Sequence, residues 1–300
     1  MGIQLRVLHF NRDHSKWVGG DAVQVESTMA ALQRLGVDCT YSCDPNVDLS
    51  SYDLVHIYHL TYHWGSAMAL RCRGEGKPYI MSAIYYPQGG HVLMEIVDNS
   101  RVTIALSQAE KDEMVQILGC NPDKIIIVSN GVDSSIFYPS IVETERTWVV
   151  NNGQIIETKG VLLLAQACAR LGLPYVHIGQ FHGDAYGQVC MPLIHKHYQG
   201  LTLTQVAEVL RACRLYVCPS LGERQSLGVL EAAACGLPVV DSGFNRGSGL
   251  LPSSIIVDPR DSQGLDCAIM AKYAECENPD PVPTWDSIAA QILEVYNGPV

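Results

Sequence analysis

The chain has 300 residues, of which 47% are hydrophobic and 17% are charged. This length exceeds what one small core requires and suits two domains of about 100 to 150 residues each, and no apolar run approaches the roughly 18 residues that a membrane-spanning helix needs. The 20 basic and 31 acidic residues give a net charge of −11, spread over both halves, which disfavours nonspecific nucleic-acid binding because that depends on basic side chains.

The beginning of the chain predicts a strand. Residues 3–10 (IQLRVLHF) alternate apolar and polar side chains and contain neither the apolar region nor the cleavage site of a signal peptide. We therefore expect a cytoplasmic protein without a transmembrane segment.

Short β-branched runs then alternate with longer helical stretches, a pattern typical of a parallel sheet covered by helices. The helix that begins at Asp21 is apolar on one face, and Gly36 suits the left-handed residue that follows a helix. The apolar face consists of Val25, Met29, Leu32 and Leu35. We predict strands at 5–10, 38–42, 54–58, 79–82, 102–105 and 125–128, and helices at 21–35, 66–73 and 108–118.

A loop (NGVDSSIFYPS) and a polar tract at 140–147 resemble a linker, after which the same alternation returns. We predict strands at 148–151, 175–178, 215–218, 239–241 and 255–257, and helices at 161–171, 204–213, 227–235 and 262–274. The expected fold is α/β, with Rossmann-like doubly wound domains at 1–140 and 141–284. The amphipathic C-terminal helix at 285–300 is expected to pack back on the N-terminal domain.

The cysteines and histidines suggest metal or disulfide chemistry only weakly. Eleven cysteines include two close pairs, Cys39 with Cys43 and Cys213 with Cys218, and neither pair has the C-x-x-C spacing. We expect reduced thiols; a disulfide framework or a zinc site is the alternative. Three histidines near the end of the third strand have changing spacing, which favours a structural or cleft-lining role over metal ligation. They are His56, His59 and His63.

The segment at 218–240 (CPSLGERQSLGVLEAAACGLPVV) is the most informative part of the sequence. A strand ends, a loop follows, and Glu223 and Glu231 lie eight positions apart across the start of a helix. A helix N-terminus attracts phosphate through its free N–H groups and its dipole. A carboxylate can accept hydrogen bonds from two neighbouring hydroxyls, so Glu231 suits a ribose and Glu223 suits a sugar. A solvated face is the alternative for both residues.

The pattern P-S-x-x-E-x7-E-A-x-A-x-G-x-P-V-V resembles the donor-binding signature of the family 4 glycosyltransferases, retaining enzymes with the GT-B fold. Four further segments resemble family elements in the same order. They are Gly19-Gly20 before a helix, YDLVHIYHL at 52–60, IIIVSNGVDSSIFYP at 125–139 and NGQIIETKG at 152–160. The resemblance implies two Rossmann-like domains that face each other across a cleft, with the acceptor on the first domain and a nucleotide-diphosphate sugar on the second.

The resemblance also implies the roles of individual residues. The expected catalytic group comprises Glu223 and Lys159, which match the family pattern, and Arg224, a hypothesis based on a departure from that pattern. Donor binding is assigned to Gly19, Gly20, Gln154, Lys159, Glu223, Ser226, Leu227, Gly228 and Glu231, and cleft-lining positions to His56, Tyr85, Tyr86, His91 and Asn130. No metal or other cofactor is expected, and the donor base is expected to be uracil or guanine.

Two departures from the family pattern concern the diphosphate and the transferred sugar. Gln154 stands where the family carries an arginine, so Lys159 is the matched cation, and Arg224, where the family commonly has glycine, is a candidate substitute. The family carries a T-x-H motif after the fourth strand, and its histidine contacts the transferred sugar. This chain has Ser82-Ala83-Ile84-Tyr85 at that point and lacks the histidine. Tyr85, Tyr86 or His91 is expected to occupy its space.

The predicted activity is transfer of a sugar to an acceptor, with retention of configuration. The acceptor is a glycan, a lipid-linked sugar or a small molecule, with nucleic acid the weakest alternative. The rival functions are a nucleotide-sugar epimerase or a phosphorylase on the same scaffold, and a catalytically silent nucleotide-sugar-binding or assembly protein. A nicotinamide-dependent dehydrogenase is disfavoured because no G-x-G-x-x-G follows the first strand.

Overall fold

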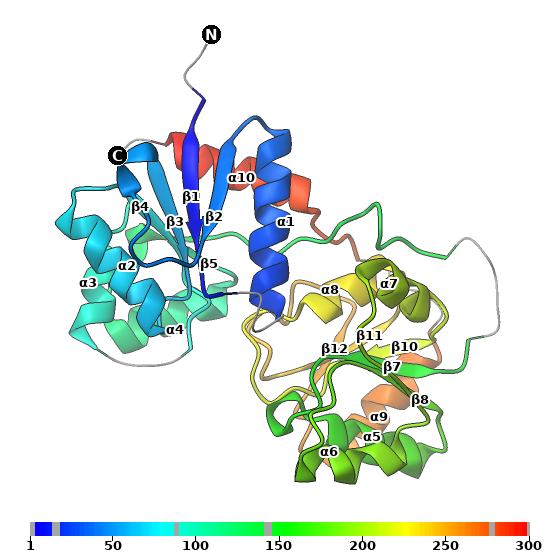
Figure 1. Cartoon of the computed structure of the whole chain (residues 1–300). Coiled ribbons are helices and arrows are strands. Elements are labelled where there is room, and N and C mark those ends of the chain that lie inside the picture. Colours follow the sequence, from blue (N-terminus) through cyan, green and yellow to red (C-terminus); the bar gives the residue numbers. More distant parts are fainter. Residues whose placement is uncertain (1–3, 14–18, 87–89, 141–145, 276–279, 299–300) are drawn as a thin grey trace. The chain divides into compact units, whose positions relative to one another are not determined.

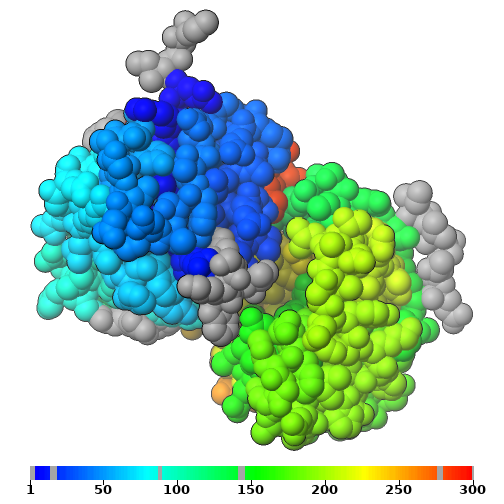
Figure 2. All heavy atoms as spheres, in the orientation of Figure 1, coloured from blue at the N-terminus to red at the C-terminus, as the bar shows by residue number. Residues whose placement is uncertain are grey.

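The computed structural model describes residues 4–13, 19–86, 90–140, 146–275 and 280–298 (Figure 1). The chain divides into two compact units, one formed by Met1–Gly131 with Pro283–Val300 and the other by Val132–Val282. The boundary between the units lies at 131–132, before the polar tract at 140–147 where the domain boundary was predicted, because Val132 and Phe137 are buried in the core of the second unit. Within each unit the heavy atoms form a continuous surface on the face that Figure 2 shows.

The first unit is a parallel sheet in the order β2-β1-β3-β4-β5-β6. Its strands are β1 (Arg6–Phe10), β2 (Asp38–Ser42), β3 (Leu54–Tyr58), β4 (Tyr79–Ser82), β5 (Thr103–Ala105) and β6 (Ile125–Ile127). Its helices are α1 (Gly20–Arg34), α2 (His63–Gly74), α3 (His91–Asn99), α4 (Gln108–Leu118) and α10 (Trp285–Asn297), with 3-10 turns η1 (Leu49–Ser51) and η2 (Pro122–Lys124). All six expected strands are present.

The second unit is also a six-stranded parallel sheet, in the order β12-β11-β10-β7-β8-β9. Its strands are β7 (Val149–Asn152), β8 (Tyr175–Ile178), β9 (Lys196–Tyr198), β10 (Leu215–Val217), β11 (Val239–Ser242) and β12 (Ile255–Val257). Its helices are α5 (Val161–Leu171), α6 (Ala185–Cys190), α7 (Leu203–Arg211), α8 (Leu227–Ala234) and α9 (Ser262–Tyr273), with 3-10 turns η3 (Glu157–Lys159) and η4 (Met191–Leu193).

Each sheet has a point where the strand order reverses, between β1 and β3 in the first unit and between β7 and β10 in the second. In a doubly wound sheet the loops at the carboxyl ends of these two strands diverge to opposite faces and leave a crevice, where ligands bind. The strand order therefore gives each unit one candidate ligand-binding position.

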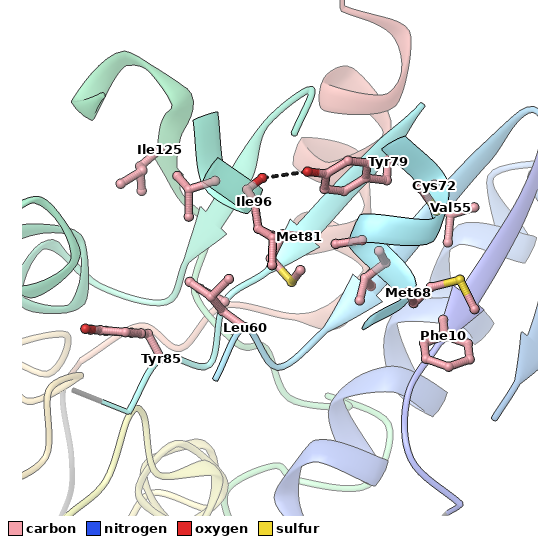
Figure 3. Close-up of a cluster of buried hydrophobic side chains, with 14 of the residues drawn as sticks. Phe10, Val55, Leu60, Met68, Cys72, Tyr79, Met81, Tyr85, Ile96 and Ile125 are labelled. Atoms are coloured by element: carbon pink, nitrogen blue, oxygen red, sulfur yellow. Dashed lines mark hydrogen bonds between the residues drawn. The ribbon is translucent and has the colours of Figure 1, made fainter. Parts of the chain in front are cut away.

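Apolar packing holds each sheet to its helices. In the first unit, side chains from β3, β4, α2, α3 and α4 form one core, and the Tyr79 hydroxyl donates to the Ile96 carbonyl at 2.6 Å (Figure 3). The C-terminal helix α10 belongs to this unit: its Tyr296 hydroxyl lies 2.6 Å from Nδ1 of His56, and its Asp286 pairs with Arg34 of α1.

The described cysteines are free thiols, buried except for Cys43 and Cys267, and Cys276 lies outside the described residues. In the described ranges no group of histidine, cysteine and carboxylate side chains has the arrangement of a metal site. No helix in the same ranges is long and apolar enough to cross a membrane.

Candidate functional site

The reversal point of the second sheet holds an ion pair between Lys159 and Glu223. Lys159 ends η3, which follows β7, and Glu223 lies in the loop between β10 and α8. The hydroxyl of Ser220 donates to the same Glu223 oxygen at 2.9 Å. The Glu223 side chain is 14% exposed and the Lys159 side chain 31%. The structure therefore joins two of the predicted site residues into one partly exposed charged cluster.

Close backbone contacts bring these two loops together. Gly160 has a left-handed φ of +63°, and a Cβ at this position would lie 2.0 Å from the Pro219 carbonyl oxygen. The Leu221 N–H donates to the Thr158 carbonyl at 2.8 Å. Gly160 consequently allows both the turn into α5 and the contact between the lysine loop and the glutamate loop.

The backbone of Glu223 is fixed from its other side by the loop after β11. Its N–H donates to the Phe244 carbonyl and its carbonyl accepts from Arg246, both at 3.0 Å. Below this bridge, Asn245 donates to both carboxylate oxygens of Asp241 at 3.1 and 2.9 Å. Burial raises the pKa of Asp241 to about 6.

The second carboxylate, Glu231, points toward the end of β7. Asn152 donates from Nδ2 to Glu231 Oε2 at 3.0 Å and accepts from the Tyr216 hydroxyl at 2.6 Å. Glu231 is 7% exposed, and burial raises its pKa to about 7 despite the opposing effect of the Asn152 hydrogen bond. Glu231 thus occupies a buried polar chain and not the solvated helix face that was its alternative.

The remaining predicted donor residues surround this cluster. Ser226 is the N-cap residue of α8, and Leu227 and Gly228 form its first turn. Gln154 follows the glycine at the end of β7, and Arg224, next to Glu223, is only 8% exposed. The structure brings these residues to one end of the sheet. It leaves their individual roles as predictions.

Sequence reasoning missed the residues that support the two glutamates, namely Asn152, Tyr216, Ser220, Asp241 and Asn245. Asn152 carried a usable signal, because it ends an otherwise buried strand at the edge where ligands bind. Nothing in the sequence marked Tyr216 as a site residue, since a tyrosine inside an apolar strand is ordinarily a core residue.

The reversal point of the first sheet holds a second polar cluster, centred on Asp21. Gly19 is the N-cap residue of α1 and Gly20 its first residue. Arg12 makes two hydrogen bonds of 2.6 Å to the carboxylate of Asp21, and His59 Nε2 lies 3.3 Å from the same group. Burial alone would raise the pKa of Asp21, but the hydrogen bonds from His59 and Arg12 lower it below its usual value.

Of the three histidines at 56, 59 and 63, His59 has the features of a functional residue. It follows β3 directly, is 5% exposed and has a left-handed φ of 68°, which is strained for a residue other than glycine. The predicted cleft-lining histidine was His56 instead. The change of spacing between the three histidines marks the place where the strand ends, and His59 is the first histidine beyond it.

Two of the predicted cleft residues are core residues. His56 is fully buried, with Nδ1 hydrogen-bonded to Tyr296 and Nε2 to Ser82 at 2.8 Å. Tyr85 is also fully buried, and its side chain belongs to the apolar core of the first unit (Figure 3). Its N–H donates to Glu110. The prediction that they line a cleft was wrong, because neither exposes a surface to a ligand.

The other predicted cleft residues are spread along the first unit. Tyr86 is 40% exposed, 6.3 Å from the ring of Tyr62, which itself stacks on Trp64 at 4.6 Å. His91 is exposed at the start of α3, and Asn130 is buried beyond β6. Of these residues, Tyr86 is the one placed beside the loop that carries His59.

Two family models match separate parts of the chain. The model described as Glycosyltransferase Family 4 matches residues 45–136, and the model described as Glycosyl transferases group 1 matches residues 146–273. The second match contains both glutamates, Lys159 and Asn152, whereas the first contains His56 and His59.

Curated relatives agree with this assignment. The chain is 24% identical to the alpha-maltose-1-phosphate synthase of Mycolicibacterium smegmatis, over 85% of this chain and 82% of that protein. It is 28% identical to the D-inositol 3-phosphate glycosyltransferase of Paenarthrobacter aurescens, over 67% of this chain and 58% of that protein.

Solved structures share the fold. Sucrose-phosphate synthase from Thermosynechococcus elongatus has a TM-score of 0.82 at 15% identity, covering 98% of both chains. Anabaena HepE, crystallised with UDP and glucose, has a TM-score of 0.75 at 14% identity, covering 99% of this chain and 100% of that one. Two parallel Rossmann-like sheets and these neighbours establish a GT-B fold. The chain is therefore a glycosyltransferase with the GT-B fold, and residues 45–136 match the family 4 model.

Proposed function

We propose that this glycosyltransferase takes its sugar from a nucleotide-diphosphate sugar bound on the second unit and transfers it with retention of configuration. The ion pair between Lys159 and Glu223 carries the proposal. In this pair a cation that could bind a diphosphate lies beside a carboxylate that could accept from sugar hydroxyls, at the reversal point of the sheet and before the N-terminus of α8.

The diphosphate is the leaving group, and its negative charge grows as the glycosidic bond breaks. Lys159 would bind it together with the N–H groups in the first turn of α8, which no carbonyl within the helix can satisfy. Ser226, Leu227 and Gly228 form this end of the helix. Two sources of positive potential therefore meet where the departing charge needs them.

The two glutamates bind different hydroxyls in this proposal. Glu231 accepts from the ribose diol, and Glu223 accepts from the transferred sugar while its other contacts, Lys159 and Ser220, hold it in place. HepE, a neighbour in fold, was crystallised with UDP and with UDP-glucose, which supports a nucleotide-sugar donor of this kind.

We place the acceptor on the first unit, at the cluster of Arg12, Asp21 and His59. A histidine oriented by a carboxylate and neighbouring tyrosine rings offers both hydrogen bonds and a stacking surface to a hydroxylated molecule. The names of two relatives contain maltose 1-phosphate and inositol 3-phosphate. Sugar phosphates and cyclitol phosphates thus belong in the acceptor panel, beside neutral sugars.

A thermal-stability screen tests the donor proposal. Purified protein is heated with UDP-, GDP- and ADP-linked sugars, and the matching donor at 100 times its Kd is expected to add about 2.7 kcal/mol to the free energy of unfolding. Transfer is then assayed with the acceptor panel in EDTA, where we expect activity to persist because Lys159 and the helix neutralise the diphosphate. Absence of a shift with every donor contradicts the proposal.

A catalytically silent sugar-nucleotide binder is the second candidate. Gln154 replaces the arginine of the family pattern, and the histidine of the T-x-H motif is missing. A thermal shift with a donor, combined with neither hydrolysis nor transfer across the acceptor panel, would favour this function over the enzyme.

A further inference from the structure

A chain of three polar side chains runs beneath the N-terminus of α8. The Tyr216 hydroxyl of β10 donates to Asn152 Oδ1 at 2.6 Å, and Asn152 Nδ2 donates to Glu231 Oε2 at 3.0 Å. Tyr216 is fully buried and Glu231 is 7% exposed. These side chains cross from β10 to β7, the two strands of the reversal point, and end on α8, the helix that follows β10.

The donor and acceptor roles in this series of hydrogen bonds follow from the chemistry of the three side chains. An ionised carboxylate can only accept hydrogen bonds, so Asn152 must turn its NH₂ group toward Glu231. Its carbonyl oxygen then faces Tyr216, and a tyrosine hydroxyl that donates to this oxygen fixes the orientation of the amide. Burial raises the pKa of Tyr216 well above its ordinary value, which keeps it a neutral donor.

The backbone of α8 leaves room for this arrangement. A Cβ at Gly228 would lie 1.8 Å from Asn152 Oδ1 and 2.5 Å from the Tyr216 hydroxyl. A side chain of any size at position 228 would therefore push the amide away from both partners. The glycine in the first turn of α8 serves the Tyr216–Asn152 hydrogen bond directly.

Two titratable neighbours of Glu231 belong to the part of the chain that the structure describes. Tyr216 of β10 and Cys235, just beyond the end of α8, interact with it electrostatically, and burial raises the pKa of the Cys235 thiol to about 12. Both groups are thus neutral at physiological pH. Burial favours the protonated form of Glu231, and the hydrogen bond from Asn152 favours the ionised form.

We propose that Asn152, oriented by Tyr216, is a positioning residue that keeps Glu231 ionised and aimed at the ribose diol of the donor. This inference rests on the proposed function, which assigns the ribose to Glu231. Asn152 itself need not touch the donor. Its effect on binding is carried by the charge and direction of the neighbouring carboxylate.

Binding of UDP and 2′-deoxy-UDP to the full chain, measured by calorimetry, separates this role from a structural one. Wild-type protein is expected to prefer UDP by about tenfold or more, because a hydrogen bond to a charged group is lost in the deoxy compound. In Asn152→Ala and Tyr216→Phe this ratio is expected to fall severalfold. Asn152→Asp, which puts a second carboxylate against Glu231, is expected to abolish the preference.

The pH dependence gives a second readout. In wild-type protein the ratio of the two affinities should rise as pH increases through about 7, the pKa to which burial raises Glu231. Loss of the Asn152 amide removes a group that favours the ionised form, so the midpoint should move upward by about one pH unit in Asn152→Ala. The titration of the UDP phosphate cancels in this ratio, since both ligands carry the same diphosphate.

Tyr79→Phe is the matched control, because it removes a buried hydroxyl that donates to the Ile96 carbonyl in the core of the first unit. It should lower thermal stability and leave both the ratio and its midpoint unchanged. An unchanged ratio and midpoint in Asn152→Ala and Tyr216→Phe, or tighter UDP binding in Asn152→Ala, overturns the inference. If wild-type protein binds none of the nucleotide diphosphates, the proposed function itself fails.

Discussion

At the scale of single residues, the site depends on charges that are kept close together in partly buried surroundings. The Glu223 carboxylate has two donors, Lys159 and Ser220, and its exposed fraction is only 14%. Removing one partner of such a pair leaves the other charge desolvated and unpaired. Substitutions here should consequently affect both the local structure and the chemistry, and matched variants are needed to separate the two.

Glu223→Gln should reduce sugar transfer by about 100-fold, because the amide keeps the size of the side chain but loses the charge that pairs with Lys159. Steady-state kinetics with the identified donor measures the effect. Asp266→Asn is the control, since it removes the acidic member of the partly exposed pair with Arg170 in the same unit. Equal kinetics in wild-type and Glu223→Gln protein would contradict a role for this carboxylate.

Arg224→Ala tests whether this arginine replaces the one missing at position 154. Kinetic measurements should show a fall of kcat by about tenfold or more, because the leaving diphosphate loses a neutralising charge. Gln154→Arg is expected to restore much of the activity in the double variant. If Arg224→Ala alone has normal kinetics, Lys159 and the helix N-terminus suffice.

At the scale of elements, the sequence predicts most of the fold because buried parallel strands and amphipathic helices carry strong patterns. All strands of the first sheet and five of the second are found close to their expected positions. The α-helices and strand of the structure that were not predicted from the sequence are α3, α6 and β9. The short edge strand β9 has the sequence KHY and no fully buried residue, so neither β-branched enrichment nor an apolar run marks it.

The candidate site was predictable to the extent that it lies in two short contiguous motifs, 152–160 and 218–240. Glu223, Glu231 and Lys159 were named from sequence, whereas most of their supports come from other elements, namely β7, β10, β11 and the loop after β11. Such partners are brought together by strand order, which a single sequence does not reveal. Likewise, the burial of His56 and Tyr85 depends on helices packed over the sheet, and that packing made two plausible cleft residues into core residues.

Gly160→Ala should destabilise the second unit by about 2 to 4 kcal/mol, because the new Cβ would collide with the Pro219 carbonyl in addition to straining the backbone. Chemical denaturation measures the loss. Gly172→Ala is a close control: this glycine follows the same helix α5 with a φ of +66° and has no atom within 4 Å of its Cβ position. It should cost about 1 kcal/mol. Equal losses in the two variants would show that the loop contact is unimportant.

At the scale of the whole molecule, the two units carry different buried titratable groups. Burial lowers the pKa of His9 to about 3 and, with a further contribution from His9, lowers that of His56 well below its ordinary value. Both histidines belong to the first unit. In the second unit burial lowers the pKa of His177 to about 4, but it raises the pKa of Glu231 to about 7 and that of Asp241 to about 6.

Acid should therefore destabilise the first unit more than the second. A histidine whose folded pKa is lowered contributes stability that is present above about 6.5 and is lost as pH falls, at about 1.4 kcal/mol per pH unit for each group. The raised carboxylates act in the opposite sense, because their stability is present below about 4.5 and is lost as pH rises through about 7. Hydrogen exchange at pH 5 and pH 7, resolved by peptide, should show protection lost mainly in β1 and β3. Uniform loss in both units would contradict this expectation.

The way the chain is divided has a consequence for its synthesis. The second unit is one uninterrupted stretch, Val132–Val282, whereas the first is completed by α10, which supplies the Tyr296 hydroxyl to buried His56. A ribosome releases the second unit whole, while the earlier stretch still lacks the helix that covers its sheet. The unit that is translated first is thus the unit that is completed last. Until α10 emerges, Nδ1 of His56 lacks its Tyr296 partner, and the apolar surface that α10 covers is exposed and can bind chaperones.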